Sequence, residues 1–220
     1  MLTAQLINHN VPRLRPNDSV LKARQLANDF KLTHLPVVSE KKFLGLISEE
    51  DLLDTEDSSV LIEHRPEVLQ LVYIQDDVHF MNAVSHCIQY ETNVVPVLDK
   101  AAEFIGVITA SNLLKTMGDF AGANEIGGLI ILEMERVHFS LSEISRIVEG
   151  NDCTILHLNT QTDPVSGMLT VTLHLDRKDI SAVVATFERF EYQVKYEFGA
   201  RKFDDPSQDN YRNLMKYLDL

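Results

Sequence analysis

The sequence has few cysteines, few basic residues and no long apolar run, and each shortage excludes a class of protein. Its two cysteines, Cys87 and Cys153, fall in segments with a buried pattern, so we expect free thiols in a reducing compartment and no disulfide. Only 20 Lys and Arg oppose 33 Asp and Glu, for a formal charge of −13. This balance argues against binding to nucleic acid or to an anionic membrane.

Apolar runs such as Leu129–Leu132 are short, whereas a membrane helix needs about 20 apolar residues. The first residues, Met1–Gln5, show no basic stretch ahead of an apolar core, so no signal peptide is expected. We therefore expect a soluble, cytoplasmic protein. Its apolar fraction of 45% is ordinary for a chain that buries a core.

Motifs of common enzymes and metal sites are also missing. There is no G-x-x-x-x-G-K-[ST] loop and no G-x-S-x-G elbow, so we expect no enzymatic activity. Four histidines lie on a predicted helix or on predicted strands, but without H-E-x-x-H or C-x-x-C spacing, namely His79, His86, His157 and His174. Such histidines are mostly structural, and we expect neither a metal site nor a bound cofactor.

What the sequence does contain is an internal duplication. In Gly45–Asp51, two apolar residues after a glycine end a short strand, and Ser48-x-x-Asp51 has the spacing of a helix capping box. Gly106–Asn112 repeats this pattern about sixty residues later. By itself each copy predicts only the start of a helix.

Counting along the two copies excludes coincidence. An alanine precedes a proline by thirteen positions in both copies, and a glycine precedes a hydroxyl residue by three in both. The matched positions are Ala23, Pro36, Gly45, Ser48 and Asp51 in the first copy and Ala83, Pro96, Gly106, Thr109 and Asn112 in the second. A repeat of this length predicts two like domains packed about a pseudo-twofold axis.

These paired positions make residues 1–118 resemble a tandem pair of CBS domains. The resemblance implies an α+β fold of two βαββα repeats, which we place at residues 1–58 and 59–120. It also implies an adenosine-bearing ligand in the cleft between the repeats. AMP, ADP or ATP, with or without Mg²⁺, come first, and S-adenosylmethionine or NAD-type ligands follow.

The resemblance also implies a role for each candidate residue. Asp51 would hold the ribose diol, and Ser48 and Thr109 would face the ribose or the phosphate. The starts of two strands would flank the adenine, through Thr33, His34, Leu35 and Pro36 in one repeat and Asn93 and Val94 in the other. Arg13 and Arg15 are the candidate cations for the phosphate, with His34 as a third. Asn112 replaces the second aspartate, so we expect one competent site and a weak or empty second one.

Residues 121–126 are expected to be a linker, and residues 127–200 show the order βαββαβ, the split ferredoxin-like plan. Following a CBS pair, this segment resembles an ACT domain. ACT domains often bind an amino acid where a glycine follows the first strand, but Glu135–Ser140 contains no glycine. We therefore expect pairing between subunits here more than amino-acid sensing. In the tail, 201–220, helical spacing of Tyr211, Leu214, Met215 and Leu218 predicts a helix that docks on a neighbouring domain or subunit.

Several local expectations accompany this plan. We expect Val20, Ala23, Ala27 and Phe30 to share one buried helix face, and Ser19, Asp76 or Asp77, Ser140 and Asp179 to cap helices. We expect Gly150 to end a helix and Cys153–Leu158 to form a strand.

The arrangement CBS–CBS–ACT in a short chain resembles accessory proteins of acetoin utilisation. We therefore expect a homodimeric regulatory protein that senses an adenosine nucleotide and transmits occupancy to a partner enzyme. Two alternatives are a ligand-independent scaffold or inhibitory subunit of a metabolic enzyme, and an enzyme whose catalytic residues are not recognised. A thermal-shift screen against adenosine ligands separates the first alternative from the sensor.

Overall fold

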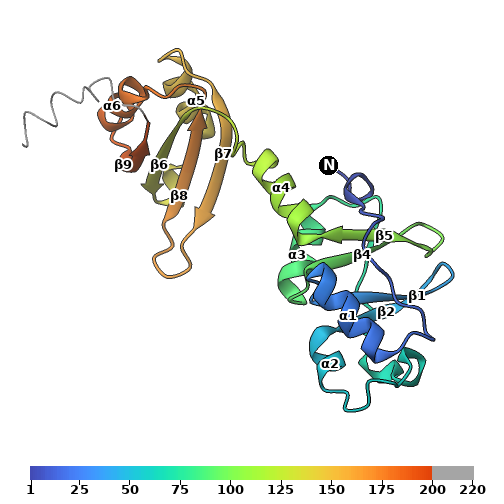
Figure 1. Ribbon diagram of the computed structural model, residues 1–220. Helices are drawn as coiled ribbons and strands as arrows, with labels where there is room; N and C mark the ends of the chain where they lie inside the picture. The colour runs from blue at the N-terminus through green and yellow to red at the C-terminus, as the bar shows by residue number, and fades with distance from the viewer. Residues whose placement is uncertain (200–220) are drawn as a thin grey trace, which may run out of the picture. The chain divides into compact units, whose positions relative to one another are not determined.

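The computed structural model describes residues 1–199 (Figure 1). They belong to two compact units, Met1–Met117 and a second unit that starts at Gly118, and the fold is of mixed α+β type. The finer boundaries predicted around residues 58 and 120 stay predictions. The helix predicted in the tail, at Tyr211–Leu218, lies outside the described residues.

The first unit contains the two repeats in the predicted order. The first repeat has α1 (Val20–Phe30), β1 (His34–Ser39), β2 (Lys42–Ser48) and α2 (Glu49–Leu53). The second has β3 (Ile74–Gln75), α3 (Met81–Gln89), β4 (Val94–Leu98), β5 (Phe104–Thr109) and α4 (Ala110–Phe120), whose residues after Met117 belong to the second unit. Short 3-10 turns lie at Thr3–Leu6, Ile62–His64 and Pro66–Val68.

Strand register confirms the duplication. β1 and β2 pair antiparallel with Pro36 opposite Leu46, and β4 and β5 pair antiparallel with Pro96 opposite Val107. Both hairpins have a register shift, after Val37 in one and after the equivalent Val97 in the other. The two repeats therefore share their irregularities as well as their elements.

Two crossing segments, which the sequence analysis did not predict, tie the repeats together. The first residues of the chain lie on the second repeat, where Asn8 N–H donates to Val107 O at 2.7 Å and the fully buried Thr3 hydroxyl donates to Gln75 O at 2.7 Å. The segment between the repeats lies on the first repeat, where Leu46 N–H donates to Gln70 O at 2.8 Å. Each repeat is thus completed by chain from outside it.

The two motif glycines make room for these crossing segments. Gly45 and Gly106 both have φ of 152°, in the range that disfavours residues with a side chain. A Cβ at Gly45 would lie 2.9 Å from Leu69 Cβ, and one at Gly106 would overlap Ile7 Cγ2. The glycines of the duplicated motif are therefore needed for close approach of the backbone.

Helix ends in the first unit partly differ from expectation. Ser19 caps α1 as predicted, accepting from Lys22 N–H at 3.3 Å. Phe30 is 51% exposed and not on the buried face, because it lies in the last turn, just before the chain reverses at Lys31 with φ of 54°. Asp76 and Asp77 do not cap α3, since the helix begins at Met81, several residues further along, and has no side-chain cap.

The second unit has the predicted βαββαβ order of a ferredoxin-like fold. It consists of β6 (Gly128–Met134), α5 (Leu141–Glu149), β7 (Ile155–Thr162), β8 (Leu169–Leu175), α6 (Ser181–Arg189) and β9 (Gln193–Phe198), with a 3-10 turn at Arg136–His138. The strands form one antiparallel sheet in the order β7-β8-β6-β9 (Figure 1). Ser140 caps α5 and Gly150 ends it, as predicted.

Two local predictions in this unit were wrong. The strand predicted at Cys153–Leu158 begins at Ile155 and continues to Thr162, because it pairs with β8 along that whole length. The N-cap residue of α6 is Ile180 and not Asp179. Asp179 instead accepts from the Ser181 hydroxyl at 2.6 Å, so its carboxylate stabilises the turn before the helix.

Candidate functional site

The candidate site begins where β1 starts and β2 ends. His34 is paired with Ser48 in the β1–β2 register, so the start of β1 lies beside the start of α2. Glu49 N–H also donates to Thr33 O at 2.8 Å. The fold therefore brings Thr33, His34, Ser48 and Asp51 together, as the sequence analysis proposed.

Asp51 and Ser48 hold each other in place. The Ser48 hydroxyl accepts from Asp51 N–H at 3.0 Å and donates to Asp51 Oδ2 at 2.5 Å. This differs from a full capping box, in which the carboxylate would reach back to the backbone N–H of the capping residue. Among the described residues, no hydrogen-bond donor reaches the second carboxylate oxygen of the half-buried Asp51. One oxygen is thus fixed and the other is available.

His34 is buried beside this carboxylate. The ring is 8% exposed, and Nδ1 lies 3.0 Å from the Thr33 hydroxyl. Burial lowers the pKa of His34 below its usual value, and the negative charge of Asp51 acts in the opposite direction. Burial therefore favours the neutral form of the imidazole beside the candidate acceptor.

Replacing Asp51 with asparagine is expected to lower the pKa of His34 further. The substitution removes the charge that favours the imidazolium and leaves the burial that opposes it. The pKa is measured by NMR titration of the ring protons. Glu50→Gln, in the same turn of α2, is the matched control and should shift the His34 pKa less. Equal shifts in both variants would show that Asp51 does not face His34.

Thr33 and Asn93, equivalent residues of the two repeats, contact each other directly. Thr33 N–H donates to Asn93 Oδ1 at 3.0 Å, and Asn93 N–H donates to Thr33 Oγ1 at 3.1 Å. The two side chains are 3.2 Å apart, and Asn93 Nδ2 donates to Lys31 O at 2.8 Å. We call this contact the Thr33–Asn93 clasp. Sequence reasoning placed both residues at the site but did not predict that they bond to each other.

The equivalent position of the second repeat is built differently. Thr109 accepts from Asn112 N–H at 3.3 Å, which repeats the helix cap. The Asn112 amide donates to Leu6 O at 3.4 Å, in the crossing segment from the start of the chain. The Asn112 side chain thus hydrogen-bonds to the crossing segment, whereas Asp51 keeps one carboxylate oxygen available.

Leu35, Pro36 and Val94 are predicted site residues that lie in the core. Leu35 and Val94 are 0% exposed, and Pro36 is also buried. Their side chains pack between the repeats and within the sheets. Any contact with a ligand at these positions would come from their backbone.

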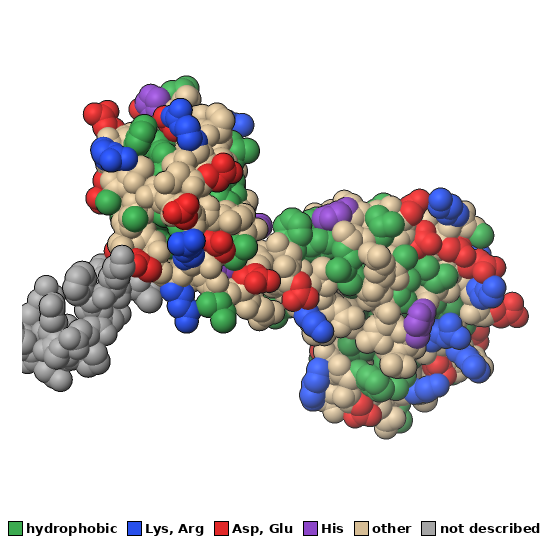
Figure 2. Space-filling model, turned by 90° about the horizontal axis from the view of Figure 1, so that it is seen from above, with side chains coloured by type: hydrophobic (Ala, Val, Ile, Leu, Met, Phe, Trp, Pro, Cys, Tyr) green, Lys and Arg blue, Asp and Glu red, His purple; other side chains and the backbone are tan. Residues whose placement is uncertain are grey.

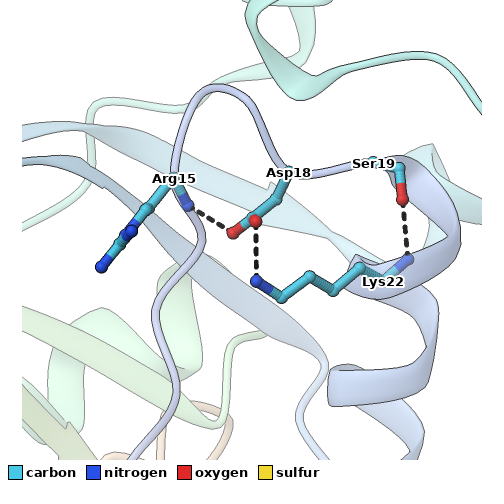
Figure 3. A network of polar contacts seen from close by, with 4 residues as sticks. All are labelled: Arg15, Asp18, Ser19 and Lys22. Carbon is cyan, nitrogen blue, oxygen red and sulfur yellow. Dashed lines mark hydrogen bonds and ion pairs between the residues drawn. The ribbon is translucent and has the colours of Figure 1, made fainter.

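Arg13 and Arg15 lie away from Asp51. They line a cavity of 510 Å³ together with Ser39, Glu40 and Glu63, at the end of β1 opposite to His34. Arg15 N–H donates to Asp18 at 2.8 Å, but the Arg15 side chain points away from that carboxylate (Figure 3). The structure therefore does not bring the two predicted phosphate cations to the proposed ribose acceptor.

Charge near Asp51 is negative. Glu49, Glu50 and Asp51 form the first turn of α2, and that helix is only five residues long. Elsewhere on the face of the first unit shown in Figure 2, acidic and basic side chains are mixed. The position beside Asp51 is therefore a poor environment for a triphosphate without a bound cation.

The second unit has an acidic cavity of 500 Å³ beside the turn after β6. Its lining includes Glu133, Glu135, Glu143 and Glu191, with His138 and Tyr192. Tyr192 donates to Glu143 at 2.8 Å, and burial together with this hydrogen bond raises the pKa of Tyr192 to about 12. Glu133 is paired with Lys195 and Glu143 with Arg146, but Glu135 and Glu191 would still repel the carboxylate of a free amino acid. In the part of the chain that the structure describes, no group of His, Cys, Asp and Glu is arranged to hold a metal ion.

Comparison with known families and proteins gives one match to a family model. Residues 4–57, in the first repeat, match the CBS domain. The inosine-5'-monophosphate dehydrogenase of Korarchaeum cryptofilum is 25% identical over 126 residues, which cover 56% of this chain and 26% of that protein. The mitochondrial CBS domain-containing protein CBSX3 of Arabidopsis thaliana is 38% identical over 61 residues, which cover 27% of this chain and 28% of that protein. The chain spans about a quarter to two fifths of the length of such relatives.

Solved structures similar to this chain include a CBS domain pair/ACT domain protein of Thermotoga maritima, with a TM-score of 0.49 and 15% identity over 55% of this chain and 98% of that one. Another is CBSX2 in complex with AMP, with a TM-score of 0.46 and 19% identity over 54% of this chain and 97% of that one. No helix of residues 1–199 combines the length and apolar character needed to cross a membrane.

Proposed function

We propose that the first unit is a non-enzymatic sensor that binds an adenosine-type ligand at Asp51. The observation that carries the proposal is that the two carboxylate oxygens of Asp51 differ in their hydrogen bonding. One oxygen accepts from Ser48 at 2.5 Å, and the other has no donor among the described residues. A carboxylate held in one orientation is a preorganised acceptor for two adjacent hydroxyl groups, as a ribose presents them.

The CBS match supports the choice of ligand, because it covers the segment that contains Thr33, His34, Ser48 and Asp51. In the proposal, Asp51 accepts from the ribose, Ser48 orients Asp51, and the backbone at Thr33 and His34 contacts the base. Thr109 and Asn112 form a second position without a carboxylate, which we propose to be weak or empty. The phosphate contact proposed for Arg13 and Arg15 would need a ligand long enough to reach the other end of β1.

The negative charge of the first turn of α2 narrows the ligand class. Glu49 and Glu50 flank Asp51, so a bare triphosphate would be repelled. We propose adenosine, AMP or a Mg²⁺-chelated triphosphate as the ligands most compatible with this charge. Occupancy would favour one relative orientation of the two repeats, and the ACT-like second unit would report it to a second copy of the chain or to a partner enzyme in the cytoplasm.

Asp51→Ala is expected to weaken binding of adenosine ligands by about 1–3 kcal/mol, roughly 5- to 150-fold, because the half-buried acceptor is lost. Isothermal titration calorimetry measures this with adenosine, AMP, ADP and ATP, the last two with and without Mg²⁺. Where wild type binds, ligand at a hundred times Kd should stabilise the first unit by about 2.7 kcal/mol. Glu50→Ala, which removes a neighbouring charge, is the control and should not weaken binding.

Three results would contradict the proposal. If Asp51→Ala bound every ligand as tightly as wild type, the ribose assignment would be wrong. If wild type bound none of them, a ligand-independent scaffold would be the better interpretation. Turnover of a bound nucleotide would instead support an enzyme.

A further inference from the structure

We propose that the Thr33–Asn93 clasp is a closed position of the site, which the ligand must open in order to bind. This inference rests on the proposed function, since it concerns ligand access to the Asp51 carboxylate. It assigns to Asn93, a residue of the second repeat, control over a site whose acceptor belongs to the first.

The clasp uses up the hydrogen-bonding groups that a base would need. Thr33 N–H and Asn93 N–H, the donors at the two strand starts, are both occupied, by Asn93 Oδ1 at 3.0 Å and by Thr33 Oγ1 at 3.1 Å. The nitrogens of an adenine ring are acceptors and require such donors. The ring can therefore bond to these N–H groups only after the clasp has opened.

The clasp is also connected to the carboxylate through side chains. The Thr33 hydroxyl lies 3.0 Å from His34 Nδ1 and 3.2 Å from Asn93 Oδ1, and His34 in turn faces Asp51. A hydroxyl has a single proton to donate, so Thr33 can donate to Asn93 while it accepts from a protonated His34 Nδ1, but it must choose between His34 and Asn93 when that nitrogen carries no proton. A change in the hydrogen bonding of His34, beside Asp51, can thus change the hydrogen bond from Thr33 to Asn93 in the second repeat.

A second link between the repeats lies far along the strands and provides a control. Lys41 forms an ion pair with Glu103 at 2.8 Å, and Phe43 stacks on Phe104 with ring centroids 6.2 Å apart. These residues lie at the hairpin ends of the strands, whereas Thr33 and Asn93 precede the starts of β1 and β4. Breaking this link also loosens the repeats but leaves the donors at the strand starts occupied.

The test compares AMP and adenosine binding by wild type, Asn93→Ala and Glu103→Gln in calorimetry. Asn93→Ala should bind about five- to tenfold more tightly, because the ligand no longer displaces a hydrogen-bonded side chain. Glu103→Gln should bind as wild type does. Circular dichroism establishes that each variant is folded. If Asn93→Ala bound no more tightly than wild type, or if Glu103→Gln gained affinity equally, the clasp proposal would be overturned.

A covalent version of the clasp keeps the proposal testable should Asn93→Ala fail to fold. Thr33→Cys combined with Asn93→Cys, in a Cys87→Ser background, places two thiols at the contact. The oxidised protein should bind AMP at least tenfold more weakly than the same protein after reduction. Equal binding in the two states would count against the clasp alone. Absence of binding by wild type and by all variants, reduced or oxidised, would overturn the proposed function as well.

Discussion

Phe187→Ala is expected to unfold the second unit under mild conditions while ligand binding by the first unit is unchanged. Phe187 is 0% exposed and packs with its neighbours from α5, α6 and the sheet in a core that contains no residue of the first unit. Removing a buried aromatic ring costs about 3–5 kcal/mol through lost burial and the cavity left behind. Much of the stability of a small domain would be lost.

Hydrogen exchange resolved by segment measures this effect, because it reports the two units separately. Amides of β6 and β8 should lose protection in Phe187→Ala, and amides of β1 and β2 should keep it. Phe190→Ala is the matched control, since Phe190 is 44% exposed and its ring centroid lies 5.7 Å from Arg189 Cζ. Its cost should be below about 1 kcal/mol. Loss of protection in β1 and β2 would show that the first unit depends on the core of the second.

Gly106→Ala is expected to destabilise the first unit by about 2–4 kcal/mol, the sum of backbone strain and overpacking. The backbone at Gly106 has φ of 152°, and an added Cβ would overlap Ile7 Cγ2 in the crossing segment. Relief requires that segment to move, which would break the hydrogen bond from Asn8 N–H to Val107 O. The damage should therefore appear first at the start of the chain.

Denaturant unfolding followed by circular dichroism gives the loss of stability, and hydrogen exchange at Asn8 and Val107 locates it. Gly167→Ala controls for backbone strain without a clash, because Gly167 has φ of 72° but nothing lies within 4 Å of its added Cβ. Gly167→Ala should lower the free energy of unfolding by only about 1 kcal/mol, and it should do so in the second unit. Equal losses in the two variants would mean that the close approach to Ile7 contributes nothing.

The fold was predictable where it depends on local pattern and on repetition. Equal spacing of Ala23 and Pro36 and of Ala83 and Pro96 predicted two equivalent hairpins, and their registers are equivalent even in the position of the irregularity. Helix ends were less predictable. Asp76 and Asp77 are good capping residues by type, but the parallel pairing of Ile74 and Gln75 with β4 keeps the chain extended just before them.

At the candidate site, the sequence predicted the residues that adjacent strands bring together. Ser48 and His34 meet because an antiparallel hairpin pairs its two ends. The Thr33–Asn93 clasp joins residues sixty positions apart in different repeats, and no local pattern marks such a contact. Arg13 and Arg15 are candidates by their charge and by their place just ahead of the first helix, and neither feature fixes where their side chains point. Leu14, between them, is fully buried, so alternation along an extended strand directs both arginines to the surface at the far end of β1.

The crossing segments decide how this chain could be divided in the laboratory. A cut between the repeats would leave Gly45 facing an empty groove where Leu69 and Gln70 had been, and would take from Gly106 its neighbours Ile7 and Asn8. Neither half should therefore fold when expressed alone, although each contains a complete copy of the motif. The two halves mixed in one tube should recover structure only by exchanging these strands.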